Sequence, residues 1–90
     1  MTVEQLIDKY KLFLQNEYGI EQGRDQGDKA ISPREHAEHL FWMLEQMRKE
    51  EVWDDPLKLN RWLGFVQGAF WRGGEMRIKD MRDQTRGLTL

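Results

Sequence analysis

The chain has 90 residues, 39% of them hydrophobic and 33% charged, with a formal net charge of −2 and no cysteine. This length fits one small domain, and the lack of cysteine excludes a disulfide framework and a thiolate metal site. No apolar run approaches the ~20 residues that cross a bilayer, and the N-terminus lacks the basic and then apolar pattern of a secretory signal. We therefore expect a single cytoplasmic domain over residues 1–90.

The composition predicts an all-α fold, because good helix formers dominate and β-branched residues are few. Apolar residues recur at helical spacing and nowhere alternate long enough for a strand. The expected architecture is a small helical bundle with three main helices plus a short C-terminal helix. These helices are predicted near residues 2–18, 33–51, 56–72 and 78–85.

The first helix is predicted to begin with a capping box of Thr2 and Gln5 and to end at Gly19. Glycines then recur every four residues among polar neighbours, which predicts a Gly-rich loop over residues 19–32. This segment has neither the Gly-Lys-Ser/Thr ending nor the preceding strand of a phosphate-binding loop. We interpret it as a connector, although connections of this length in small domains are usually functional or mobile.

The second helix is predicted to begin after Ser32, where Ser32-Pro33-Arg34-Glu35 combines a cap with a proline in the first turn. Its apolar face is formed by Ala37, Leu40, Phe41, Leu44 and Met47. Trp42 falls off that face. Two interpretations are open: Trp42 is an exposed anchor for a partner, or a loop covers it.

The third helix, opened by Asp55 and Pro56, is apolar around most of its circumference. We expect Trp62 and Phe70 in the core and Gly73-Gly74 at its end. A second face supplies a candidate oligomer interface: Leu57, Gly64, Phe65, Gly68 and Trp71. Its glycines leave a groove that a second backbone can enter, and a two-fold dimer is favoured. The alternative is that the 19–32 loop or the C-terminal helix covers this groove.

Charge divides the chain into two unlike halves. Residues 1–55 carry 13 acids and 7 bases, hence −6, whereas residues 56–90 carry 3 acids and 7 bases, hence +4. This polarity indicates an acidic partner for the C-terminal half, internal complementarity, or head-to-tail contact between copies. The low total charge argues against nucleic acid. The candidate binding residues are aromatic and basic: Trp42, Trp71, Arg72, Arg77 and Arg82.

One cluster has the residue types of a metal site. His36 and His39 are three residues apart on one predicted helix and supply two ligands, but the sequence offers no obvious third donor. Ser32 is the only serine, and its role as a helix cap accounts for it. We therefore predict no catalytic residue, no metal site and no cofactor.

Two acidic pairs suggest an enzymatic alternative. Glu35 and Glu38, with Glu45 further along, and Asp80 and Asp83 near the end are spaced as E-x-x-E and D-x-x-D. They are similar to the carboxylate pairs of MazG-type nucleoside triphosphate pyrophosphohydrolases, in which hard oxygen ligands hold magnesium. The doubled glutamates of that family's first motif are missing here, and the second pair lies on a short basic segment.

The segment NRWLGFVQG at residues 60–68 is followed by FW at 70–71 and IKDMRDQTR at 78–86, and HLFWM stands earlier, at 39–43. Together these motifs, over residues 36–86, resemble a group of small bacteriophage-encoded helical proteins. Arg77 departs from that group's pattern, which has Ser or Thr at this helix start. The resemblance implies a phage accessory protein that binds a host component or a small signal molecule.

The leading hypothesis is a non-enzymatic phage-type accessory protein in the host cytoplasm. We expect it to bind a host macromolecule or an anionic nucleotide-type signal, as a counter-defence or host-takeover inhibitor. The alternative is a MazG-like, magnesium-dependent nucleoside triphosphate pyrophosphohydrolase.

Overall fold

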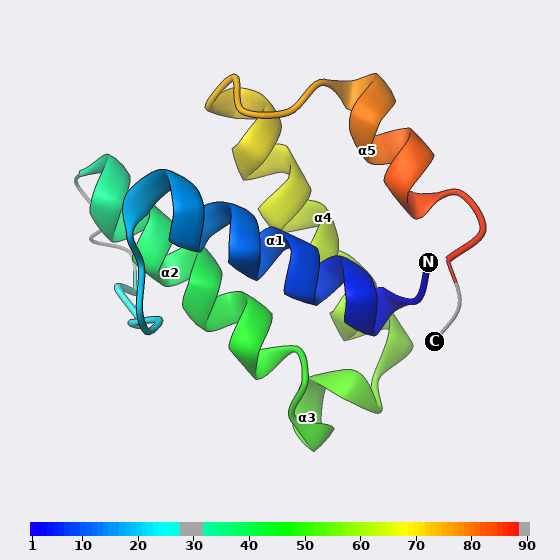
Figure 1. The fold of residues 1–90 in the computed structure, drawn as a ribbon. Coiled ribbons are helices and arrows are strands. Elements are labelled where there is room, and N and C mark those ends of the chain that lie inside the picture. Colours follow the sequence, from blue (N-terminus) through cyan, green and yellow to red (C-terminus); the bar gives the residue numbers. More distant parts are fainter. Residues whose placement is uncertain (28–31, 89–90) are drawn as a thin grey trace.

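The structure is a computed structural model that describes residues 1–27 and 32–88. The elements within these residues are all helices, which confirms the predicted all-α fold. They are α1 (Val3–Tyr18), α2 (Pro33–Gln46), α3 (Glu50–Trp53), α4 (Pro56–Arg72) and α5 (Ile78–Thr85). Helix α2 contacts α1 and α4, α3 contacts α4, and α5 is set apart from α2 and α3 (Figure 1). No helix in the described part combines the length and apolarity that crossing a membrane requires.

Hydrogen bonds and backbone geometry confirm the predicted starts of three helices and the predicted end of the first. The Thr2 hydroxyl accepts from the Gln5 backbone N–H at 3.1 Å, and the Gln5 side chain accepts from the Thr2 N–H at 2.9 Å. The side chains of Ser32 and Asp55 likewise accept from the backbone N–H three residues on. Gly19 follows α1 with a φ of 64°, a left-handed conformation that glycine adopts without strain. Short-range polar contacts therefore fix where three helices begin and one ends.

The prediction of one helix over residues 33–51 is wrong. Helix α2 ends at Gln46, and the N–H groups of Arg48 and Lys49 donate to carbonyls three residues back, which makes a tight turn. A separate short helix, α3, follows. The turn changes the direction of the chain between two buried side chains, Met47 and Val52, so both reach the core. Residues 47–49 contain no glycine or proline that would break a helix. Burying Met47 and Val52 in the core therefore stabilises the fold more than continuing α2 would.

Phe70 lies at the centre of the core, as predicted, and is fully buried. Its ring packs edge-to-face on Tyr10 and Phe13, with centroid separations of 5.1 and 5.3 Å. Trp62, predicted to share this core, is only half-buried. It lies at the edge of the core, with its ring centroid 6.0 Å from that of Trp42. The apolar surface of α4 therefore has two parts: a buried face that includes Phe70, and a neighbouring, partly exposed side that includes Trp62.

The hydroxyl of Tyr10 links three helices. Tyr10 on α1 is completely buried, and its hydroxyl donates to Gln84 of α5 at 2.7 Å. The same oxygen accepts from the side-chain amide of Gln67 on α4 at 3.0 Å. Burial raises the pKa of the Tyr10 hydroxyl, while the hydrogen bond from Gln67 opposes that shift. The neutral hydroxyl is therefore the form that the folded protein favours.

We predict that Tyr10→Phe lowers the free energy of unfolding by about 1–3 kcal/mol, because two hydrogen bonds of a buried group are lost. The raised pKa predicts a second effect. The folded state holds the phenolic proton more tightly than the unfolded chain, so wild-type stability falls as the pH rises above about 10. The variant loses this contribution. Urea unfolding from neutral to alkaline pH measures both effects, and equal stability with an equal alkaline decline in the two proteins would contradict the assignment.

Two of the aromatic residues of α4, Phe70 and Trp62, are predicted to differ in their contribution to stability. Phe70→Ala removes a fully buried ring and should cost about 3–5 kcal/mol. Trp62→Ala should cost less, because the indole is partly exposed to water in the folded state. Thermal or urea unfolding of both variants gives the order, and a Trp62→Ala variant that is the less stable of the two would show that the indole belongs to the main core.

Candidate functional site

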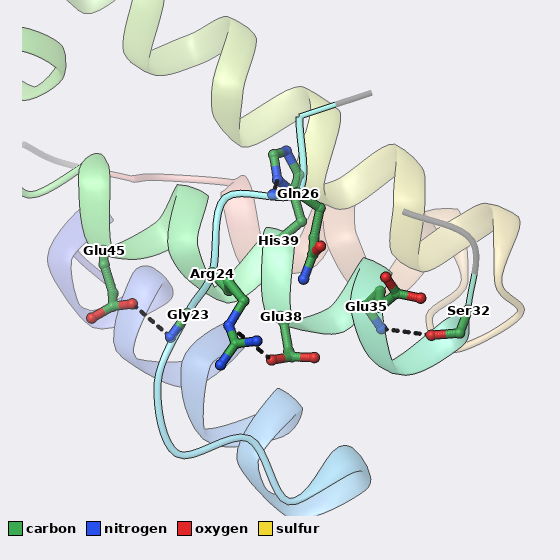
Figure 2. A network of polar contacts seen from close by, with 8 residues as sticks. All are labelled: Gly23, Arg24, Gln26, Ser32, Glu35, Glu38, His39 and Glu45. Atoms are coloured by element: carbon green, nitrogen blue, oxygen red, sulfur yellow. Dashed lines mark hydrogen bonds and ion pairs between the residues drawn. The ribbon is translucent and has the colours of Figure 1, made fainter. Parts of the chain in front are cut away.

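Residues 20–27, which we call the strap, lie along α2 and use its acidic side chains (Figure 2). The backbone N–H of Gly23 donates to the Glu45 carboxylate at 3.0 Å. The N–H of Arg24 donates to the Glu38 carbonyl at 3.1 Å, and the guanidinium of Arg24 lies 3.9 Å from the Glu38 carboxylate. These contacts fold the first part of the predicted 19–32 loop onto α2. Residues 28–31 of that loop lie outside the described residues.

The two histidines have different surroundings. His39 Nδ1 accepts from the backbone N–H of Gln26 at 3.2 Å and lies 3.7 Å from a carboxylate oxygen of Asp25, so it also holds the strap. Its ring stacks on Trp42 with a centroid separation of 5.5 Å. His36, in contrast, lines a cavity on the other side, between α2 and α4. The two rings are therefore not placed as a pair of metal ligands.

The candidate magnesium ligands are not brought together either. Glu38 and Glu45 lie seven residues apart on α2, each held by the strap, and Glu35 occupies the first turn of that helix. Asp80 is paired with Arg77 on α5, at 3.3 Å, and the guanidinium and backbone N–H of Arg77 lower the pKa of that carboxyl. Across the residues that the structure describes, no three His, Cys, Asp or Glu side chains form a group able to hold a metal ion.

The surroundings of Trp42 come from the strap, from α2 and from α4. The strap passes so close that a Cβ atom on Gly23 would clash with the backbone nitrogen of Trp42. Trp42 is half-buried between His39 and Trp62. The indole therefore packs between α2 and α4, with part of its surface still exposed.

The predicted oligomer interface is exposed. Leu57, Phe65 and Trp71 expose 77%, 59% and 56% of their surface. Between them, a Cβ atom added to Gly64 or Gly68 would meet nothing within 4 Å. We call these five residues the open face of α4. The strap lies on α2, and α5 lies beside the open face rather than over it, so within the described residues neither predicted cover fills the groove.

Two hollows meet at Gly68. The smaller lies between α4 and α5 and is lined by Trp71, Ile78 and Arg82, among others. The larger, of about 750 Å³, lies between α1, α2 and the C-terminal half of α4, and Arg72 lines it. The predicted binding residues are therefore divided: Trp71 and Arg82 share one hollow, and Arg72 lies at the other. Arg77 lines neither of them and is paired with Asp80.

Sequence reasoning missed one polar contact at the larger hollow. Tyr18 at the end of α1 donates to the Glu75 carboxylate at 2.9 Å, and burial together with Glu75 raises the pKa of Tyr18. Gly74, with a φ of 73°, folds the chain back after α4, so that Glu75 reaches Tyr18. The Gly73-Gly74 pair signalled the helix end, but nothing in the sequence signalled where the following carboxylate would point.

No protein-family model, curated protein or solved structure matches this chain. The function is therefore argued from the geometry of these surfaces.

We predict that Gly23→Ala displaces the strap, because the new methyl group would clash with the Trp42 backbone. Trp42 should become more exposed, which a red shift of tryptophan emission and faster quenching by acrylamide would report. Gly64→Ala is the matched control: its methyl group enters open space, and higher helix propensity should stabilise the protein by up to about 1 kcal/mol. Equal emission spectra and equal stabilities for the two variants would contradict the assigned position of the strap.

Proposed function

We propose that the chain is a non-enzymatic binding protein whose open face on α4 takes up an acidic, amphipathic helix of another protein. In the context of the phage resemblance, that protein is a host macromolecule. The observation that carries the proposal is the open face itself. Leu57, Phe65 and Trp71 remain exposed in a small domain that buries its other large apolar stripes. Large exposed apolar side chains gathered on one helix are a feature of interaction sites.

The shape of the open face supports a helix as the partner element. Gly64 and Gly68 stand one turn apart with no side chain above them, so another backbone can approach closely. The hollow between α4 and α5 beside Gly68 gives room for apolar side chains from the incoming helix. Helices that dock in such grooves use anchors at spacings of three, four and seven residues.

Charge supports an acidic partner. Arg61, Arg72 and Arg82 surround the open face, and none of them forms an ion pair within the described residues. The ion pairs of the described residues join acids and bases of the same half of the chain, such as Arg48 with Glu4 and Arg77 with Asp80. Within the described residues, no ion pair therefore joins the basic half, residues 56–90, to the acidic half. Opposite charge on a partner would steer and orient it.

The same charges weigh against the other occupants predicted from the sequence. In a symmetric dimer through this face, the arginines of one copy would meet those of the other. A compact anionic nucleotide would need several arginines converging on one point, yet Arg72 and Arg82 line different hollows and Arg77 is engaged by Asp80. The macromolecular partner therefore fits this arrangement better.

The test is a display selection of amphipathic helical peptides with the whole protein as bait. We expect the selected peptides to be enriched in Asp and Glu beside an apolar stripe. Trp71→Ala should weaken their binding at least tenfold, because interface aromatic residues often contribute 2 kcal/mol or more. Leu12→Ala, an equally exposed apolar residue on α1, is the matched control and should bind as the wild type does.

Two results would overturn the proposal. One is a selection with no acidic enrichment, or with peptides that bind Trp71→Ala and the wild type equally. The other is a wild-type protein that light scattering shows to be a stable oligomer and that Gly68→Leu converts to a folded monomer. That second result would identify a second copy of the chain as the occupant of the open face.

A further inference from the structure

The far end of the strap is fastened to α2 by a nitrogen that can take up a proton (Figure 2). The backbone N–H of Gln26 donates to Nδ1 of His39 at 3.2 Å, so this nitrogen acts as an acceptor and the neutral ring carries its proton on Nε2. The same Nδ1 atom lies 3.7 Å from a carboxylate oxygen of Asp25. The His39 side chain is 21% exposed, so water has access to the ring.

A second proton on the ring would exchange the partners of Nδ1. Imidazole takes up this proton near pH 6.5 in water, and the imidazolium donates from both nitrogens. Nδ1 then no longer accepts from Gln26, whereas the Asp25 carboxylate becomes a charged acceptor that a movement of about 1 Å brings within hydrogen-bond range. The Oδ1 atom of Asp25 also accepts from the N–H of Gly27 at 2.8 Å, so the exchange would be felt at Gly27.

The strap and α2 bring several charged groups near this ring. Asp25 is the ion-pair partner that the described residues give His39. Glu38 is the preceding residue on α2, and its carboxylate lies 3.9 Å from the guanidinium of Arg24. Glu35 stands one turn earlier, in the first turn of the helix. Asp25 is thus the carboxylate placed to receive a proton donor at Nδ1.

Aromatic rings lie between His39 and the charge contributed by α4. The ring of His39 stacks on Trp42, and Trp42 in turn lies against Trp62. The ammonium group of Lys58 is 5.7 Å from the ring centroid of Trp62, on this outer member of the row. His36, the other histidine, lines the larger hollow on the opposite side of α2. The balance at Nδ1 is therefore set mainly by Gln26 and Asp25.

We propose that His39 is a proton-sensitive switch for the end of the strap. In its neutral form Nδ1 accepts from the N–H of Gln26, and in its protonated form the ring releases this N–H and donates to Asp25. Gly23 and Arg24 donate to a carboxylate and a carbonyl oxygen, which remain acceptors from pH 8 to pH 5, so the first part of the strap stays on α2. The inference is independent of the partner-binding function proposed above, because it uses no residue of the open face.

An NMR titration of the whole protein from pH 8 to pH 5 tests the switch. The amide proton of Gln26 should move upfield on acidification as it loses its acceptor, with the same midpoint as the ring protons of His39. The Gly27 amide should follow this transition, and the amides of Gly23 and Arg24 should shift less. Carboxyl groups ordinarily titrate near pH 4, below this range. A Gln26 amide that stays constant while His39 titrates would overturn the inference.

Three variants separate the switch from a general effect of pH. In His39→Asn a carboxamide oxygen replaces Nδ1 as an acceptor that does not titrate, so the transition at Gln26 should be lost, and the spectrum at pH 8 verifies the fold. Asp25→Asn removes the charge that favours the imidazolium, and the midpoint should fall by about 0.2–0.7 pH unit, the range that exposed ion pairs produce. His36→Asn removes the other histidine and is the matched control, with an unchanged transition.

Three results with these variants would contradict the proposal. One is a transition at Gln26 that persists in His39→Asn. Another is its disappearance in His36→Asn, which would assign the proton to the other histidine. The third is an Asp25→Asn midpoint that is unchanged or higher, because Asp25 would then not be the partner of the protonated ring.

Discussion

The position of α5, and with it the accessibility of α4, depends on one buried hydroxyl. Tyr10 lies inside the bundle, and a phenol there needs hydrogen-bond partners, which Gln67 and Gln84 supply from two other helices. Helix α5 contributes only one buried residue, Met81, so apolar burial alone holds it weakly. Because Gln67 directly precedes Gly68, this polar link fixes α5 along one edge of the open face and leaves the groove uncovered.

Helix α4 consequently serves three environments at once. One side carries Phe70 into the core, a second carries the exposed glycines, and a third forms a wall of the larger hollow. Gly68 lies at the junction, in the lining of both hollows. Glycine within a helix lowers its stability by about 1 kcal/mol relative to alanine. Two such residues in an exposed stretch with nothing packed on them are more readily explained by a contact with another molecule than by folding.

The sequence predicted those parts of the fold that depend on neighbours in the chain. The caps at Thr2, Ser32 and Asp55 involve residues three positions apart, so their signals are complete within a few letters. The break after Gln46 could not be predicted in this way, because no glycine or proline marks it and the burial of Val52 decides it. Trp62 was misplaced for a similar reason: helical periodicity gives its direction, but not how far the neighbouring elements extend over it.

The candidate site was predicted only in part, since side chains from distant segments decide it. Periodicity identified the open face of α4, but the acids of α2 were open to a metal-binding interpretation until the strap was placed. Glu38 and Glu45 are engaged by Arg24 and Gly23, so a metal ion would have to displace the strap before it could use both carboxylates. The arginines around α4 require no such displacement. The C-terminal half thus carries exposed charge and exposed apolar surface already in place, and this is the physical reason why we propose binding at α4.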